Sequence, residues 1–349
     1  MTEPGAGRDE PQAHGPPPLV ATLKARPEDF VVEEVLGFAP SGEGEHAFLT
    51  VEKRGANTEW VARRLASHAG VVPMAVGFAG MKDRHAVTRQ HFTVQLPRGA
   101  APDWSALGEA EFRVLAATRH SRKLKRGGLT GNRFEIVLRD VRGDVAAAHE
   151  RLDAIERRGV PNYYGEQRFG RAGGNLVAAL AMFAGARTSR AERSILLSAA
   201  RSALFNRVVA ARVADGSWNR PLEGDVFQLD GSGSIFGPVP LDDTLRERCR
   251  DLDIHPTGPL WGRGGLRSGG AVAALESGIA CAEPALVRGL EAAGLEQERR
   301  SLRLAVRRIE RTFSGDSLTL AFELPAGGYA TTMLRELVTA GDDAAAARI

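Results

Sequence analysis

Asp83 is the residue whose surroundings best suit covalent chemistry. It lies in a short polar segment that opens with Gly80 and is flanked by Lys82 and Arg84. Cationic neighbours favour the ionised form of a carboxyl group and so lower its pKa. Such a carboxylate can serve as a nucleophile or a base at neutral pH. Taken alone, Lys-Asp-Arg in a turn is more often an exposed salt-bridge cluster, and the spacing does not separate the two interpretations.

Three further polar or aromatic positions have ordinary structural interpretations when taken alone. Lys24 fits a surface lysine. Asn132 follows a glycine and precedes a strand, where asparagine commonly forms a local backbone turn. Phe134 points to the apolar face of the same strand, as a core phenylalanine would.

A basic run could bind a polyanion. Residues 119–126 hold five cationic side chains in eight positions, although the net charge of the chain is only +3. Such a run can neutralise several phosphates and gain free energy from counterion release. It predicts phosphate contacts at Arg122, Lys123, Lys125 and Arg126. The alternative is a solvated basic loop.

Other kinds of site find little support in the sequence. The two cysteines, Cys249 and Cys281, are far apart, and the eight histidines lack metal-binding spacing, so we expect neither a disulfide nor a bound metal. Residues 262–265 lack the strand, helix and Lys-Ser/Thr of a phosphate loop. The apolar runs are too short to span a membrane and no signal peptide is present, which predicts a cytoplasmic protein.

The candidates lie among elements that hydrophobic patterns predict. Strands are predicted at residues 30–32, 75–79, 91–96 and 133–139. A helix is expected from an Asn57 N-cap to a stop at Gly70, with Trp60, Val61 and Leu65 on its buried face. Asp83 is therefore placed on a loop between two strands.

The second half of the chain has a different sequence pattern. A long amphipathic helix is predicted at residues 195–213, Gly- and Pro-rich connections at 224–270, a hairpin at 302–323 and a last helix at about 331–339. The composition shifts near residue 160 and reverts near residue 305, which suggests an insertion inside a larger domain. Residues 1–18 are rich in proline and charge and are predicted to be a disordered tail.

Several motifs occur together and in order along the chain. They lie at residues 23–32, 44–46, 57–58, 78–90, 131–134, 160–170, 197–206 and 324–331. The most specific is Phe78-Ala79-Gly80-Met81-Lys82-Asp83-Arg84-His85-Ala86-Val87-Thr88-Arg89-Gln90. In combination they resemble the pseudouridine synthase D (TruD) family, enzymes that modify uridine 13 of tRNA; residues 240–300 match least.

The resemblance implies a fold of the α/β (α+β) class. It implies a catalytic domain with a curved antiparallel or mixed sheet, interrupted by an inserted TRUD α/β domain, with RNA in a basic cleft between the two. The expected boundaries are 19–157 and 306–349 for the catalytic domain and 158–305 for the insertion.

The resemblance also assigns roles. Asp83 acts on the ribose of a flipped-out uridine, and Lys24 pairs with Asp83 and keeps it charged. The expected substrate contacts are Phe30, Asn132, Phe134 and Tyr329. The position of Tyr329 is phenylalanine in the family pattern, so its hydroxyl has no assigned role. No cofactor is expected for a redox-neutral isomerisation, and the expected partner is tRNA, bound by a monomer.

Two other functions stay open at the level of sequence. The same chemistry could act on a different RNA, or the chain could be a non-catalytic RNA-binding protein or tRNA chaperone. A metal-dependent nuclease is disfavoured because the acidic clusters that hold two metals are missing.

Overall fold

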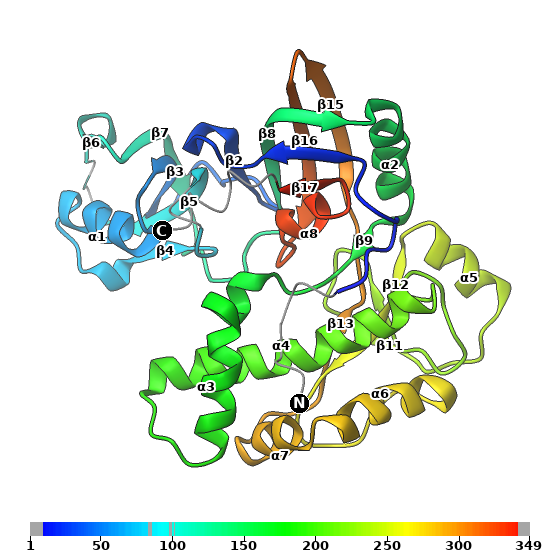
Figure 1. Ribbon diagram of the computed structural model, residues 1–349. Coiled ribbons are helices and arrows are strands. Elements are labelled where there is room, and N and C mark those ends of the chain that lie inside the picture. Colours follow the sequence, from blue (N-terminus) through cyan, green and yellow to red (C-terminus); the bar gives the residue numbers. More distant parts are fainter. Residues whose placement is uncertain (1–9, 83–85, 98–99, 101, 341–349) are drawn as a thin grey trace. The chain divides into compact units, whose positions relative to one another are not determined.

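The chain forms two compact units. The structure, a computed structural model, describes residues 10–82, 86–97, 100 and 102–340 (Figure 1). The sheet unit comprises Leu19–Val145, Arg307–Gly327 and residues 338–340. The helical unit comprises residues 10–18, Ala146–Val306 and Gly328–Leu337. We describe each unit by itself.

The sheet unit is built on one mixed sheet of 11 strands. Their order is β15-β16-β8-β2-β5-β3-β7-β6, with β1 beside β8 and β17, and β4 beside β5. Most neighbours are antiparallel, whereas β1 with β17 and β2 with β5 run parallel. The strands are β1 (Leu19–Thr22), β2 (Phe30–Val35), β3 (His46–Arg54), β4 (Val76–Phe78), β5 (Val87–Gln95), β6 (Gly108–Glu109), β7 (Phe112–His120), β8 (Gly131–Gly143), β15 (Arg307–Ser314), β16 (Ser317–Pro325) and β17 (Val338–Ala340). The predicted α/β class with a mixed sheet is confirmed.

Strand β8 carries the alternation that its sequence predicts. Phe134, Ile136 and Leu138 are all buried, and β8 pairs with β2 on one side and β16 on the other. Because the side-chain period of a strand is two, Asn132 shares this buried face. The strand is longer than residues 133–139, because β2 and β16 pair with it from Gly131 onward and β1 pairs with it as far as Gly143.

Helix α1 (Thr58–His68) covers another part of the sheet unit. Its Val61 and Leu65 lie in one apolar cluster with Leu49 of β3 and Phe92 of β5. The predicted N-cap position is correct, but the Asn57 side chain makes no capping hydrogen bond. The first helical residue, Thr58, is instead turned to other partners, described below.

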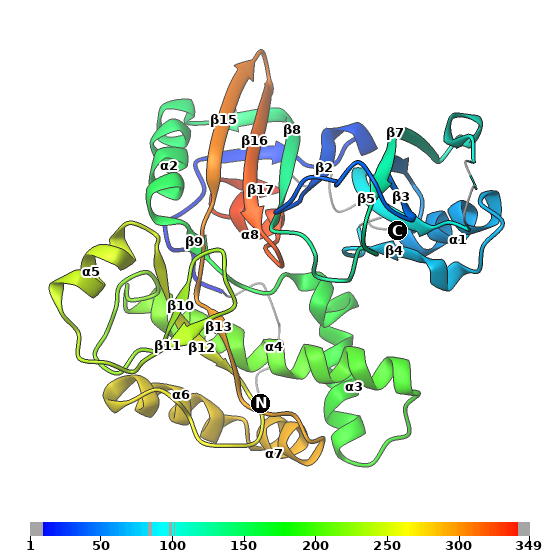
Figure 2. The ribbon, with the colours of Figure 1, turned by 180° about the vertical axis from the view of Figure 1, so that it is seen from behind.

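Helix α4 (Arg190–Ala214) organises the helical unit, as Figures 1 and 2 show. Its first half packs with α3 (Gly174–Phe183) and α7 (Pro284–Ala292), and its second half packs on Trp218 and Leu302. The other helices are α2 (Val145–Arg158), α5 (Asp243–Arg250), α6 (Gly270–Ala282) and α8 (Ala330–Leu334). The strands are β9 (Val160–Pro161), β10 (Phe227–Leu229), β11 (Ile235–Phe236), β12 (Ile254–Leu260), β13 (Glu298–Ser301) and β14 (Arg303–Leu304).

Two predictions for the second half of the chain are wrong. Residues 224–270 are more than connections, because they contain α5 and three strands of a sheet ordered β11-β10-β12-β13. Strands β10 and β11 are only three and two residues long, and β12 is interrupted by two prolines and a glycine, so none of them shows a clear alternation. The last predicted helix is only α8, since residues 338–340 form β17 and pair with β1. The hairpin is confirmed, with strands β15 and β16.

Of the predicted disordered tail, residues 1–9 lie outside the described residues, whereas residues 10–18 are held by the helical unit. The backbone N–H groups of Ala13 and His14 donate to the carboxylate of Glu336. Arg151 donates to the carbonyls of Gly15 and Pro16. A segment with few apolar groups is thus fixed through its backbone, which composition does not reveal. The helical unit also includes residues 328–337, which the expected boundaries gave to the catalytic domain.

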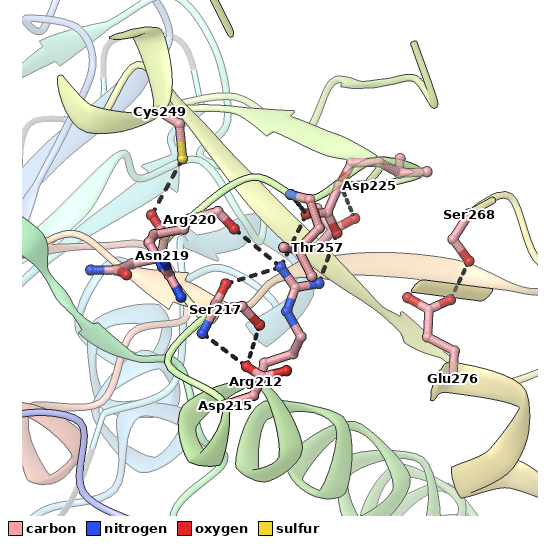
Figure 3. Close-up of polar contacts among 12 residues, drawn as sticks. Arg212, Asp215, Ser217, Asn219, Arg220, Asp225, Cys249, Thr257, Ser268 and Glu276 are labelled. Atoms are coloured by element: carbon pink, nitrogen blue, oxygen red, sulfur yellow. Dashed lines mark hydrogen bonds and ion pairs between the residues drawn. The ribbon is translucent and has the colours of Figure 1, made fainter. Parts of the chain in front are cut away.

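Buried arginines are a feature of the helical unit. The guanidinium of Arg212 is 1% exposed, forms two hydrogen bonds with Asp225, and donates to the carbonyls of Ser217 and Arg220 (Figure 3). Arg299 pairs with Glu276 at 2.5 Å. Some of the cationic side chains of this protein therefore form ion pairs inside the helical unit and are not available to bind a polyanion.

In the described part of the chain, no single helix is long and apolar enough to cross a membrane. The pair α6 and α7 passes that test of length and composition together, but it is bent by 94°.

Candidate active site

The predicted nucleophile, Asp83, lies outside the described residues. The structure shows the segment that leads into it. After β4, residues 79–82 run along the sheet unit before the chain returns in β5. Ala79 is 3% exposed and accepts a hydrogen bond from the backbone N–H of Gly127 at 2.7 Å.

Buried side chains hold both ends of residues 80–82. The Gln90 side chain donates to the carbonyl of Gly80 at 3.1 Å. The Thr58 hydroxyl accepts the backbone N–H of Lys82 at 3.2 Å and donates to Gln90 Oε1 at 3.0 Å. Thr58 and Gln90 are both fully buried, so these hydrogen bonds are shielded from competing water.

The Lys82 side chain forms a buried ion pair. Its Nζ lies 2.8 Å from Glu34 Oε1, with side-chain exposures of 9% for Lys82 and 0% for Glu34. The other Glu34 oxygen accepts the backbone N–H of His91 at 2.9 Å. Burial opposes the charged form of Glu34, but hydrogen bonding with His91 and the Lys82 ammonium outweigh it and lower the pKa of this carboxyl.

Two of the predicted site residues, Lys24 and Phe30, lie side by side. The Lys24 ammonium lies over the Phe30 ring, 4.3 Å from its centroid. Lys24 has a φ of 55°, which is uncommon for a residue other than glycine and costs about 1–2 kcal/mol. Strained backbone of this kind often occurs where a side chain must be aimed at a site.

Phe134 and Asn132 lie on the same sheet face. The Phe134 ring is 6.1 Å from Phe30 in an edge-to-face arrangement and stacks on Phe322 at 5.4 Å. Phe134 is only 6% exposed, so it can form the floor of a pocket but offers little area for stacking. The Asn132 side-chain oxygen is buried and has no hydrogen-bond partner among the residues that the structure describes.

The basic run forms the end of β7 and the loop after it. Lys123 donates to the carbonyl of Met74, and Arg126 pairs with Glu59 at 3.4 Å. Arg122 and Lys125 are exposed. The loop lies so close to β4 that a Cβ on Gly77 would come 2.4 Å from the carbonyl of Leu124. The cationic loop and the segment leading to residue 83 are therefore neighbours within one unit.

Tyr329 belongs to the helical unit, whereas the other described site residues belong to the sheet unit. Its hydroxyl accepts a hydrogen bond from Arg168 at 2.7 Å, and its ring lies 6.4 Å from that of Tyr164. Arg168 also lies over the Tyr164 ring and donates to Ser198. The hydroxyl that the family pattern leaves without a role thus has a partner.

A cavity of about 530 Å³ in the sheet unit contains none of the predicted site residues. It is lined by Phe48, His91 and Arg133 among others. In β8, Arg133 lies between Asn132 and Phe134 and therefore points to the opposite face of the sheet. Among the described residues, no group of three or more His, Cys, Asp or Glu side chains could hold a metal ion.

The sequence did not single out Glu34, Thr58, Gln90 or Arg168. Thr58, Gln90 and Arg168 lie inside motifs that carry the family resemblance, which is the one signal that could have drawn attention to them. Glu34 follows a predicted strand as one of two glutamates, and only the strand register shows which of the two is buried.

Comparison with known proteins identifies the family. The family described as tRNA pseudouridine synthase D (TruD) matches residues 13–180 and 181–337. The chain belongs to the TruD family. The prediction of a tRNA pseudouridine synthase is thereby confirmed at the level of the family, whose members isomerise uridine to pseudouridine in tRNA.

Individual TruD proteins match over nearly the whole chain. The chain is 53% identical to tRNA pseudouridine synthase D of Xanthomonas axonopodis pv. citri, covering 97% of this chain and 96% of that protein. It is 53% identical to the protein of that name from Methylococcus capsulatus, with coverages of 95% and 94%. A crystal structure from Methanosarcina mazei bearing the name TruD has the same fold, with a TM-score of 0.71 at 21% identity and coverages of 93% and 95%.

Proposed function

We propose that this protein isomerises the uridine at position 13 of tRNA to pseudouridine, with Asp83 acting on the ribose. The observation that carries the proposal is the family match through residues 13–180, which contain the motif around Asp83. The anchoring of residues 80–82 supports it, since a catalytic carboxylate must be held in place.

The chemistry needs an ionised carboxylate but no redox partner. The glycosidic bond from C1′ to N1 breaks, the uracil rotates in place, and a bond from C5 to C1′ forms; C5 loses its proton and N1 gains one, so the product is an isomer of uridine. Asp83 either attacks the anomeric carbon or removes the 2′ proton, and both roles require its charged form. Lys24 is the cation that we propose beside Asp83. The Lys82 ammonium is already paired with Glu34. It therefore stabilises the charge of Asp83 less than its neighbouring place in the sequence suggests.

The face that carries Phe30, Asn132 and Phe134 is the proposed uracil pocket. Removing the target base from its stack costs a few kcal/mol, and aromatic contact can return about 1–3 kcal/mol. The buried Asn132 oxygen without a described partner can accept an N–H of the uracil ring. Tyr329, in the helical unit, is proposed as a further aromatic contact.

Phosphate contacts are proposed for the loop that follows β7. All four side chains are exposed, but Lys123 and Arg126 already have partners in the sheet unit, so Arg122 and Lys125 are the stronger candidates. We further propose that the sheet unit is the catalytic domain and the helical unit the inserted TRUD domain. The enzyme is proposed to act as a monomer in the cytoplasm, without a cofactor.

The decisive experiment uses tRNA labelled with tritium at C5 of uridine. We expect the wild-type protein to release tritium, and Asp83→Asn to release none while binding tRNA as tightly as before. Mapping by mass spectrometry should place the new pseudouridine at position 13. Modification at another position would point to the same chemistry on a different site, and binding without tritium release by wild-type protein would indicate an RNA-binding protein.

A further inference from the structure

We propose that Glu34, Thr58 and Gln90 are positioning residues that fix residues 80–82 and, through the chain, residue 83. The inference rests on the proposed function, because it assumes that residue 83 carries the reaction. According to this proposal, three buried side chains of the sheet unit support the reaction by holding the chain in place, and none of them touches the substrate.

The first observation is that three elements converge on three residues. Glu34 lies in β2, Thr58 begins α1 and Gln90 lies in β5. Each contributes a buried polar group to the short segment between Gly80 and Lys82. The anchors hold the Gly80 carbonyl, the Lys82 backbone N–H and the Lys82 ammonium. The segment is thus fixed at both backbone ends and by its side chain.

The second observation is that the anchors depend on one another. Thr58 uses its hydroxyl twice, accepting from Lys82 and donating to Gln90. Gln90 uses its side-chain oxygen for Thr58 and its nitrogen for Gly80. The hydroxyl and the amide thus bond both to each other and to the segment, so that losing one of these side chains also removes the support of the other.

The third observation concerns the choice of a buried ion pair. Desolvation of two charges offsets most of their attraction, and well-packed apolar residues often stabilise a fold equally well. Glu34 is nevertheless 0% exposed in its side chain and is bound on both oxygens, by Lys82 Nζ and the His91 N–H. An ion pair that adds little stability but fixes the orientation of a side chain is suited to positioning. The side chain oriented here is that of Lys82, the residue before Asp83.

The test compares Glu34→Gln and Thr58→Val with wild-type protein on 5-tritiated tRNA. A displacement of about 1 Å can cost about 100-fold in rate. We expect the single-turnover rate to fall about 10- to 100-fold for Glu34→Gln and about 10-fold for Thr58→Val. The Kd for tRNA should stay within about 2-fold of wild type, because neither side chain is proposed to touch RNA.

Glu52→Gln is the matched control. Glu52 is a carboxylate of β3 that is 17% exposed in its side chain and pairs with Arg89 and Arg113, away from residues 80–82. Its substitution removes the same charge from the same sheet and should leave the rate unchanged. Thermal unfolding of every variant shows that the rates are measured on folded protein.

A double substitution separates positioning from simple stability. Because Glu34 acts through Lys82, adding Glu34→Gln to Lys82→Met should lower the rate no further than Lys82→Met does. Independent, multiplied losses would overturn the inference. So would a Glu34→Gln protein that melts at a lower temperature but keeps the wild-type rate below its Tm. An active Asp83→Asn protein would defeat the proposed function itself, whereas inactive Asp83→Asn with fully active Glu34→Gln and Thr58→Val defeats only the positioning role.

Discussion

The two units each bury an ion pair, but the pairs are built differently. In the helical unit, Arg212 places two nitrogens on Asp225 and two hydrogen bonds on backbone carbonyls, so one guanidinium joins α4 to the loop that follows it. In the sheet unit, Lys82 has Glu34 as its carboxylate partner at 2.8 Å, and its side chain is slightly exposed. The first pair is held from many sides, whereas the second holds a short segment.

The difference indicates how a buried charge can be interpreted. Removing one member of a pair is costly wherever the pair lies, because the remaining charge stays desolvated. What distinguishes the two is which atoms move when the pair is lost. Around Arg212 these are core contacts of a scaffold, and near Lys82 they are the residues next to the proposed nucleophile. Stability should therefore respond most at Arg212 and catalysis most at Glu34.

The largest expected effect on stability is that of Arg212→Met. It leaves Asp225 buried without its partner and should lower the free energy of unfolding of the helical unit by about 3–5 kcal/mol. Urea unfolding followed by circular dichroism measures this loss. The double variant Arg212→Met with Asp225→Leu should recover much of it, since both charges are then gone. If the free energy of unfolding of Arg212→Met lies within about 1 kcal/mol of the wild-type value, the ion pair of Arg212 does not stabilise the helical unit as we expect.

Two buried carboxylates should give the units opposite responses to pH. Burial raises the pKa of Glu10 to about 7 from 4.5, against the opposing effects of Arg335 and Asn206, while the pKa of Glu34 is lowered. A raised pKa contributes stability that is complete below pH 4.5 and is lost as the pH rises through about 7. The lowered pKa of Glu34 contributes stability that is complete at pH values above the ordinary pKa of a glutamate and is lost as the pH falls below it.

The titration of Glu10 should therefore make the helical unit less stable between pH 5 and 8, by at most roughly 3 kcal/mol, while the lowered pKa of His14 acts in the opposite direction. Thermal unfolding across this range checks the direction, and Glu10→Gln should flatten the dependence. Glu298→Gln serves as a control, because Glu298 is an exposed partner of Arg201 in the same unit. A Glu10→Gln protein with the wild-type slope would show that another group titrates.

The sequence predicted the elements whose patterns are regular. The alternation of Phe134, Ile136 and Leu138 predicted β8, and the 3.6-residue period predicted α4. It did not predict β10, β11 and β12, because β10 and β11 are too short to show a period and β12 is interrupted by two prolines and a glycine. Nor did it predict that residues 10–18 are bound, because their contacts are made by backbone atoms to distant residues.

The candidate site was predicted in part, for a comparable reason. Resemblance named Lys24, Phe30, Asn132 and Phe134, and the structure brings Lys24, Phe30 and Phe134 together on one face. The cation beside Asp83 in the sequence, Lys82, is instead committed to Glu34. Adjacency in the chain does not show which charge a long side chain will pair with, and the sequence likewise gave no sign that Arg212 is buried.

The exposed cations of the basic loop offer a contrast with the buried pairs. Replacing both Arg122 and Lys125 with Gln should leave the fold intact, since both side chains are exposed. If each contacts one phosphate, the slope of log K against log salt should become shallower by about 1–2. Filter binding between low and physiological salt measures the slope. An unchanged slope would show that the loop does not contact RNA. Replacing Arg187 and Arg190, which are also exposed but belong to the helical unit, provides a charge-matched control.

The smallest expected effect is that of Tyr329→Phe. The Arg168–Tyr329 hydrogen bond is only partly buried, so losing the hydroxyl should cost about 1 kcal/mol of stability. The ring remains, and the proposed contact with the substrate should therefore leave kcat/KM within about 3-fold of wild type, whereas Tyr329→Ala should lose about 1–3 kcal/mol in the same quantity. Steady-state kinetics on tRNA separates the two variants. Equal losses for both would mean that the hydroxyl, through Arg168, matters more than the ring, because the phenylalanine variant differs from wild type in that one group.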